Sequence, residues 1–256
     1  MTALTRNTTF YGHPTGNPTR RSPAKILRGA HIFVGALCAF HDDGVSSGTR
    51  LMPVTDLQNA NTPAQGGPLQ VAGADANGGL RLFAKVPHVT LIIATTGTTP
   101  VVGVTFPTGA SAPNVAVACA NTTTASEIVQ ALMANAAARE LLQVYYTGNG
   151  SGVAGTIGAT AVPYYRLAGW AKREYDNSSD ASNDLAVAEI IELDTGIGFV
   201  DNDTTDAVSA DDVGGLVSVL DDQTIQRGQH PLTLKAFLFD WQPAHAGAQG
   251  PCIRVP

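Results

Sequence analysis

The chain has 256 residues and a net charge of −6, and only 14% of its residues are charged. The acidic balance gives no reason to expect a nucleic-acid partner, and no stretch approaches the roughly 20 apolar residues that a membrane span needs. The three cysteines lie far apart and form no CxxC pair, so neither a disulfide framework nor a zinc site is expected. The many glycine, proline, threonine and serine residues favour short strands joined by turns.

The first 28 residues differ from the rest because they hold five basic residues and no acidic one. Pro14, Pro18 and Pro23 interrupt this stretch, and proline favours extended backbone. We therefore predict that residues 1–24 form an extended arm that docks on another surface. A solvated, disordered tail is the alternative. The stretch has no apolar core typical of a secretory signal, so we expect the protein to be made in a cytoplasm.

A buried strand is predicted at residues 25–40, because apolar side chains alternate on both faces there. The dipeptide Asp42-Asp43, followed by Gly44, predicts a solvated turn. Residues 55–79 have the composition of loops. Residues 80–86 are expected to form the next strand.

The composition changes at residue 88, because residues 88–165 contain only three charged side chains. Three strand-like runs are followed by a helix, which we expect to begin at a capping box made of Thr124 and Glu127. Leu141 and Leu142 either extend this helix or start a second turn after the region of Asn135. We predict an inserted α+β domain at residues 88–164.

From Tyr165 onward the composition is again that of the residues before 88. Strands are expected around the polar loop of residues 176–184, and Asp221-Asp222 is expected to form the turn of a hairpin. Residues 25–87 and 165–256 together should therefore form one β-rich domain. Cys38 and Trp170 are expected in its core.

No known catalytic motif is found in the sequence: it lacks GxSxG, HExxH, a Walker loop and a GxGxxG before a helix. We expect no enzyme activity, no cofactor and no metal site. Two alternatives stay open. Asp201, Asp203 and Asp206 resemble the start of a calcium loop whose later ligands are missing, and loop carboxylates could meet as they do in a glycosidase.

The order of motifs in two separated stretches resembles one family. Gly29 to Gly44 is similar to an opening G-x-x-I…G-a-L pattern, and it is followed, after the insertion, by a G-x-A step at Gly169 to Ala171. A D-N-S loop begins at Asp176, a D-V-G turn begins at Asp212, and the chain ends on a CIRVP strand. Residues 25–54 and 165–256 thus resemble the head decoration, or capsid cement, proteins of tailed bacteriophages.

This resemblance implies a mainly β fold: a small β-barrel or sandwich-like domain, with the inserted α+β domain and the N-terminal arm added to it. It implies a virion protein on the capsid exterior, whose partners are the major capsid protein and copies of itself, with a trimer favoured over a dimer. The family has no catalytic residues. We predict that basic side chains of the arm pair with acidic capsid surface, with two aromatic anchors beside them. The predicted contact residues are Arg6, Phe10, Tyr11, Arg20, Arg21, Lys25 and Arg28.

Two other virion functions and one enzymatic function compete with this interpretation. An adhesive or glycan-binding module of a tail or fibre is the main alternative, although fibre-like repeats are not visible. A ring-forming tail protein is the next. A secreted hydrolase would require catalytic motifs and a signal that the sequence does not show.

Overall fold

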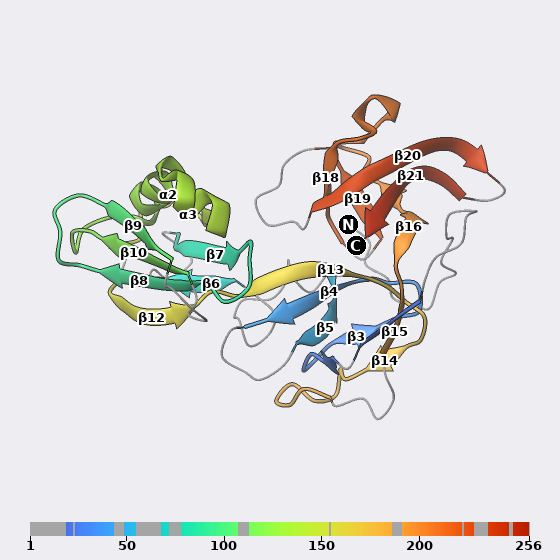
Figure 1. Cartoon of the computed structure of the whole chain (residues 1–256), viewed down its shortest axis with the longest axis horizontal. Coiled ribbons are helices and arrows are strands. Elements are labelled where there is room, and N and C mark those ends of the chain that lie inside the picture. Colours follow the sequence, from blue (N-terminus) through green and yellow to red (C-terminus); the bar gives the residue numbers. More distant parts are fainter. Residues whose placement is uncertain are drawn as a thin grey trace. The chain divides into compact units, whose positions relative to one another are not determined.

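The computed structural model describes residues 19–22, 24–43, 49–54, 68–71, 78–106, 113–153, 155–185, 191–221, 223–227, 235–245 and 248–255. Strands dominate and two short helices accompany them (Figure 1), so the mainly β prediction is confirmed. The described strands form several open sheets and no closed barrel, so the sandwich-like alternative fits and the barrel does not.

The chain divides into two compact units, and their boundary differs from the predicted one. Residues 1–41, 48–59 and 166–256 form one unit, which we call the enclosing domain. Residues 42–47 and 60–165 form the other, the inserted domain. The insertion therefore begins well before residue 88, because the strand at 69–71 pairs with the strand at 80–84, which in turn pairs with a later strand of the same unit.

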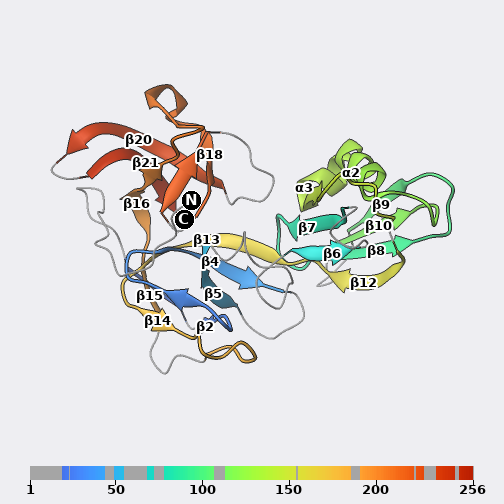
Figure 2. The same ribbon diagram turned by 180° about the vertical axis from the view of Figure 1, so that it is seen from behind.

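The described part of the enclosing domain contains two series of six strands, in each of which neighbouring strands are hydrogen-bonded. Each series is called a path below. One runs in the order β1-β15-β13-β4-β5-β2, and the other in the order β16-β21-β20-β18-β19-β17; a short β14-β3 pair completes the domain (Figure 2). The strands of the first path are β1 (Thr19–Ser22), β2 (Lys25–Ile26), β4 (Leu37–Asp42), β5 (Arg50–Pro53), β13 (Tyr164–Ala171) and β15 (Ile191–Asp194), and the pair is β3 (His31–Ile32) with β14 (Tyr175–Asp176). Those of the second are β16 (Gly196–Phe199), β17 (Asp201–Asn202), β18 (Leu216–Val219), β19 (Thr224–Gln226), β20 (Lys235–His245) and β21 (Ala248–Val255), with a 3₁₀ turn at Ala210–Asp212.

The single strand predicted at residues 25–40 is wrong. The structure has three shorter strands there, β2, β3 and β4, separated at Gly29 and Gly35. Both glycines have positive φ angles, 72° and 86°, which side chains of L-residues rarely adopt. The apolar alternation was a correct sign of burial, since Leu37–Phe40 are all buried, but it did not reveal the two turns.

Core packing in the enclosing domain follows the predicted apolar positions. Cys38 and Trp170 are buried, as expected, and so is Cys252. Hairpin β18–β19 is antiparallel and turns at Asp221, whose Oδ1 accepts hydrogen bonds from the backbone N–H groups of Gln223 (3.0 Å) and Thr224 (2.7 Å). This short polar side chain fixes the turn by satisfying two backbone donors locally.

The described end of the predicted arm is part of the enclosing domain. Strand β1 pairs antiparallel with β15, with Arg20 opposite Leu193 and Arg21 opposite Glu192. Residues 19–22 of the predicted arm are extended, but they form an edge strand of the domain's own sheet, so docking on another surface is wrong for these residues. Residues 1–18 lie outside the described part of the chain.

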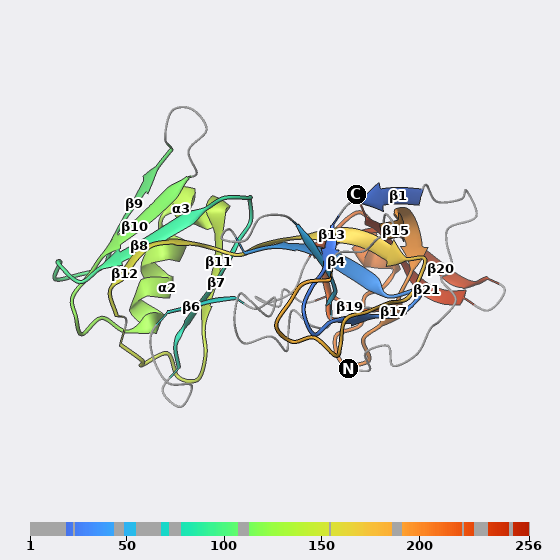
Figure 3. The ribbon, with the colours of Figure 1, turned by 90° about the horizontal axis from the view of Figure 1, so that it is seen from below.

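The inserted domain contains a four-stranded sheet in the order β12-β8-β10-β9 and a second group in which β7 pairs with β6 and with β11. Its two helices lie against the strands of both groups (Figure 3). Its elements are β6 (Leu69–Val71), β7 (Leu80–Ala84), β8 (Thr90–Ala94), β9 (Val101–Thr105), β10 (Asn114–Ala118), α2 (Ala125–Ala134), α3 (Ala136–Leu141), β11 (Leu142–Tyr146) and β12 (Ile157–Ala161). An apolar core of its own, which includes Leu91, Val115 and Leu132, holds the sheet and the helices together.

The helices begin where the sequence indicates. Thr124 caps α2, and Glu127 completes the predicted capping box. The helix stops at Asn135, where α3 begins; Leu141 is the last residue of α3, whereas Leu142 begins β11 and belongs to neither helix. Asn135 stabilises this junction twice: its Oδ1 accepts from Ala138 N at 3.0 Å, and its Nδ2 donates to the carbonyl of Val102 in β9 at 3.0 Å.

Candidate functional site

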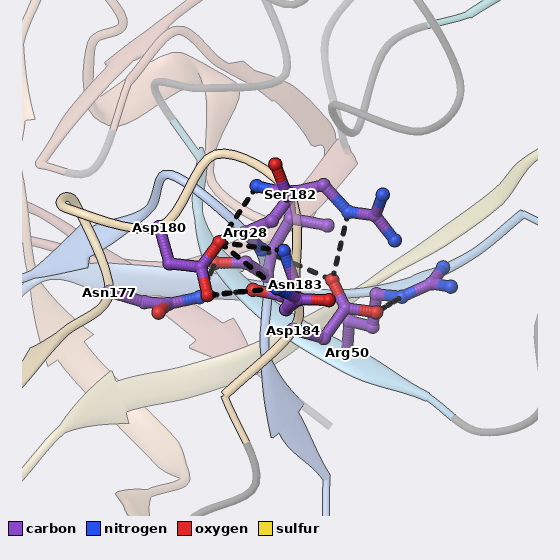
Figure 4. Close-up of polar contacts among 8 residues, drawn as sticks. Arg28, Arg50, Asn177, Asp180, Ser182, Asn183 and Asp184 are labelled. Atoms are coloured by element: carbon purple, nitrogen blue, oxygen red, sulfur yellow. Dashed lines mark hydrogen bonds and ion pairs between the residues drawn. The ribbon is translucent and has the colours of Figure 1, made fainter.

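A cluster of polar contacts in the enclosing domain forms where loop 177–184 meets the segment around residues 26–30 (Figure 4). Asn177 is buried at the start of this loop. Its backbone N–H donates to Ala30 O at 2.9 Å, and its Nδ2 donates to the carbonyls of Leu27 (3.2 Å) and Asn183 (3.0 Å). These bonds tie the loop to the N-terminal segment, which precedes it by about 150 residues.

The middle of the same loop is a tight turn organised by Asp180. Its Oδ1 accepts from the backbone N–H groups of Ser182 and Asn183, both at 2.9 Å. These bonds to the ionised carboxylate hold the pKa of Asp180 below its ordinary value. The turn directs Asp184, the last polar residue of the loop, toward two arginines (Figure 4).

Asp184 forms ion pairs with Arg28 and Arg50. Arg28 Nε donates to Oδ1 at 3.3 Å, and Arg50 Nε donates to Oδ2. Burial by itself raises the pKa of Asp184, but the hydrogen bonds from Arg50 and Arg28 outweigh it, so the pKa lies below the ordinary value. The Arg50 side chain is only 2% exposed, and Asp184 supplies a counter-charge to this buried guanidinium.

This cluster, Arg28–Asp184–Arg50, can hold segments together; it contains no nucleophile paired with a base. It joins three parts of the chain: the N-terminal segment, β5 and loop 177–184. The backbone supports the same junction, because Ile26 N donates to Leu185 O and Leu185 N donates to Ile26 O, both at 2.9 Å. The cluster is therefore a clamp on the N-terminal segment.

The structure locates only some of the predicted capsid-contact residues. Lys25 is exposed on β2, and Arg28 is half-buried in the clamp. Arg20 and Arg21 lie on β1, and their side chains are outside the described part. Arg6, Phe10 and Tyr11 also lie outside the described residues.

Sequence reasoning missed Arg50 and Asp184. Arg50 stands at the start of the apolar run Leu51–Val54, and a charge at such a place signals a buried ion pair. Nothing local identifies its partner, because 134 residues separate the two.

The acidic loop that resembles a calcium site is closed by its own backbone. Asp203 Oδ2 accepts from the N–H groups of Thr205 (3.0 Å) and Asp206 (2.8 Å). Asp201 lies on β17, and its pKa is raised by burial and by nearby Asp221. Among the described residues, no group of three or more His, Cys, Asp or Glu side chains could hold a metal ion. The turn expected to be solvated at Asp42-Asp43 is also different, because Asp43 is buried.

No helix in the described ranges has the length and apolarity required to cross a bilayer. Comparison with known proteins gave no match to any family model, curated protein or solved structure.

Proposed function

We propose that this chain is a non-enzymatic head decoration protein, which binds the outer surface of a tailed-phage capsid and stabilises the mature head. The observation that carries the proposal is the way in which the separated segments assemble. The resemblance covers residues 25–54 and 165–256, and those stretches contribute almost all of the described enclosing domain. The insertion that departs from the family's pattern, 88–165, lies within a unit that has its own core.

The geometry at the N-terminus supports attachment through the residues that precede β1. Strand β1 is an edge strand held by β15, and Arg28 is held by Asp184 in the clamp. Any segment that leaves β1 toward the N-terminus therefore starts from a fixed point. Arg6, Phe10 and Tyr11 precede that point, and we assign the capsid contact mainly to them, with the exposed Lys25 as a further contribution.

Such attachment stabilises a shell by mass action. A ligand that binds the expanded shell better than its precursor or its dissociated subunits shifts the equilibrium toward the expanded shell. Individual contacts can be weak, since association of copies with each other and with several capsid subunits multiplies their effect. The proposed partners are accordingly the major capsid protein and other copies of this chain, as a trimer or a dimer.

The decisive experiment begins with location. Immunogold labelling of purified virions that carry the tagged chain should place gold on the head. Gold on the tail or its fibres would favour the adhesive alternative instead and would refute the proposal.

The second experiment tests the attachment by adding protein to shells that lack it. A variant lacking residues 1–18 keeps β1 and the clamp, and its occupancy on shells should fall at least tenfold. A variant in which a short Gly/Ser linker replaces residues 60–163, and which therefore keeps β13 whole, serves as the matched control and should keep its occupancy. Equal occupancy of the first variant and the full chain would contradict the assigned contact.

A further inference from the structure

Strand β9 forms one edge of the inserted domain's four-stranded sheet. Within the described residues it pairs only with β10, in a regular register that runs from Val101 opposite Ala118 to Thr105 opposite Asn114. The opposite edge strand, β12, is different, because its pairing with β8 shifts register between Ile157 and Thr160. Irregular pairing of this kind protects a sheet edge from further strands, and β9 lacks it.

Charge does not protect the β9 edge either. Residues 88–126 contain no Asp, Glu, Lys or Arg, and β12 contains none. Charged side chains and prolines are the usual means by which an edge strand repels other strands. Two apolar side chains at the ends of the strand are strongly exposed: Val101, its first residue, by 63%, and Phe106, just after it, by 62%.

We propose that β9 pairs antiparallel with β9 of a second copy of this chain, about a two-fold axis at Gly103. In this register Val102 faces Val104 of the other copy, and Val101 faces Thr105. The row at the axis brings two glycines together, where backbones can approach closely. Each remaining pair across the interface occurs twice, related by the two-fold axis, so the register is self-complementary, as a two-fold interface requires.

The helix junction allows this pairing. Asn135 Nδ2 already donates to the Val102 carbonyl, but a backbone carbonyl has two lone pairs and can accept a second N–H group. Val102 and Val104 pack on the core of the inserted domain, whereas Val101, Gly103 and Thr105 are exposed on the other face. A second strand would extend both faces without changing this division.

The absence of charge also identifies the occupant. Residues 1–18, which carry one basic side chain (Arg6), are the other candidate, but residues 88–126 offer this arginine no acidic side chain. A second copy brings an equally uncharged strand, so this approach avoids the repulsion between two chains that each carry −6. The pairing involves only this chain and does not depend on attachment to a capsid.

The experiment uses the full chain and one substitution that the fold tolerates. A Cβ added at Gly103 meets no atom within 4 Å, so Gly103→Lys should leave the folded chain intact. In the proposed dimer the two lysines face each other at the axis, where like charges oppose pairing. Gly158→Lys, on β12, is the matched control, because a Cβ there also meets nothing within 4 Å.

Sedimentation velocity at about 100 µM, a concentration at which interfaces of small area can assemble, measures the outcome. The mass obtained for the full chain and for Gly158→Lys should be twice the 26.4 kDa of one chain. The mass obtained for Gly103→Lys should be that of one chain. Mixing Gly103→Lys with Gly103→Glu should restore the dimer, which a folding defect could not do. Removal of residues 1–18 should leave the dimer unchanged.

Five results would overturn the proposal. Four of them are a monomeric full chain, a dimeric Gly103→Lys variant, a mixture of the Lys and Glu variants that stays monomeric, and loss of the dimer on removing residues 1–18. The last result would identify residues 1–18 as the segment that pairs with β9. Disruption by Gly158→Lys would instead move the contact to β12 and would equally refute the β9 pairing.

Discussion

Asp184 is the residue on which the clamp depends, because one carboxylate serves two arginines. A buried charge that loses its partner keeps its full desolvation penalty. The Arg28 side chain is 26% exposed and can turn to water, but that of Arg50 cannot. The two arginines therefore do not contribute equally, and the cost of losing Asp184 falls mainly on Arg50.

We expect Asp184→Asn to lower the free energy of unfolding by about 3 kcal/mol, the typical cost of breaking a buried ion pair. Urea denaturation followed by fluorescence measures it. Asp176→Asn, at the end of β14 just before the loop, is the control, because that side chain is 56% exposed and an asparagine oxygen can still accept from Ser178. The control should change stability by less than about 0.5 kcal/mol. Similar losses for both would mean that Arg50 does not depend on the ion pair.

The same carboxylate predicts a pH dependence. The folded-state pKa of Asp184 lies below its unfolded value, so its contribution is complete above the unfolded pKa of about 3.9 and is lost as pH falls through the folded pKa. The stability difference between the unmodified chain and Asp184→Asn should therefore be constant from pH 7 to about pH 5 and shrink below about pH 4. Denaturation curves across this range test it. A difference that grows on acidification would have the wrong sign.

Asn135 shows how a single side chain determines where an element ends. Its oxygen caps α3 while its nitrogen reaches β9, so the break between the two helices is also their connection to the sheet. The α2 start was predictable from Thr124 and Glu127, because a capping box is read within four residues. The bond to Val102 was not, since it joins positions 33 residues apart.

We expect Asn135→Asp to keep the α3 cap and to lose the donor to Val102. The free energy of unfolding of the inserted domain should fall by about 1 kcal/mol, the typical net value of one hydrogen bond. Asn149→Asp is the matched control, because Asn149 uses its Oδ1 as an acceptor for Ser151, which aspartate can also provide. Thermal unfolding followed by circular dichroism would distinguish them. An unchanged transition for Asn135→Asp would show that the cap alone fixes the junction.

At the scale of strands, the sequence predicted turns that depend on neighbouring residues, but it misassigned a strand whose domain depends on a distant pairing partner. The Asp221 turn was predictable from its two aspartates. Strand β7 has the same apolar pattern as the strands of the enclosing domain, so it was assigned there. Its pairing with β11, Leu82 opposite Val144, places it in the inserted domain instead. No local pattern within residues 60–87 reports that distant partner.

For the whole molecule, two separate apolar cores imply two separate unfolding events. Leu91 lies in the core of the inserted domain, and Ile253 is buried in the enclosing domain. Large-to-small substitution in a core typically costs about 2 to 5 kcal/mol. Chains with several domains commonly depart from a single two-state transition.

Scanning calorimetry of the full chain should accordingly resolve two transitions. Leu91→Ala should lower the midpoint of one, and Ile253→Ala should lower the midpoint of the other. The double variant should show both midpoint shifts, each equal to that of its single variant, because the two residues belong to different cores. One transition that both substitutions shift equally would mean that the two cores unfold as a single unit.

The position of the insertion has a consequence for the order in which the chain folds. Strand β4 meets its neighbour β5 early, but β13 and β15 follow only after an interruption of about 100 residues. All the strand partners of β8, β9 and β10 lie within that interruption. During synthesis the inserted domain can therefore complete its four-stranded sheet before β13 and β15 of the enclosing domain have been made. Once folded, the inserted domain replaces a long flexible loop between β5 and β13 with a compact body. Pairing of β4 with β13 in the enclosing domain then costs less chain entropy.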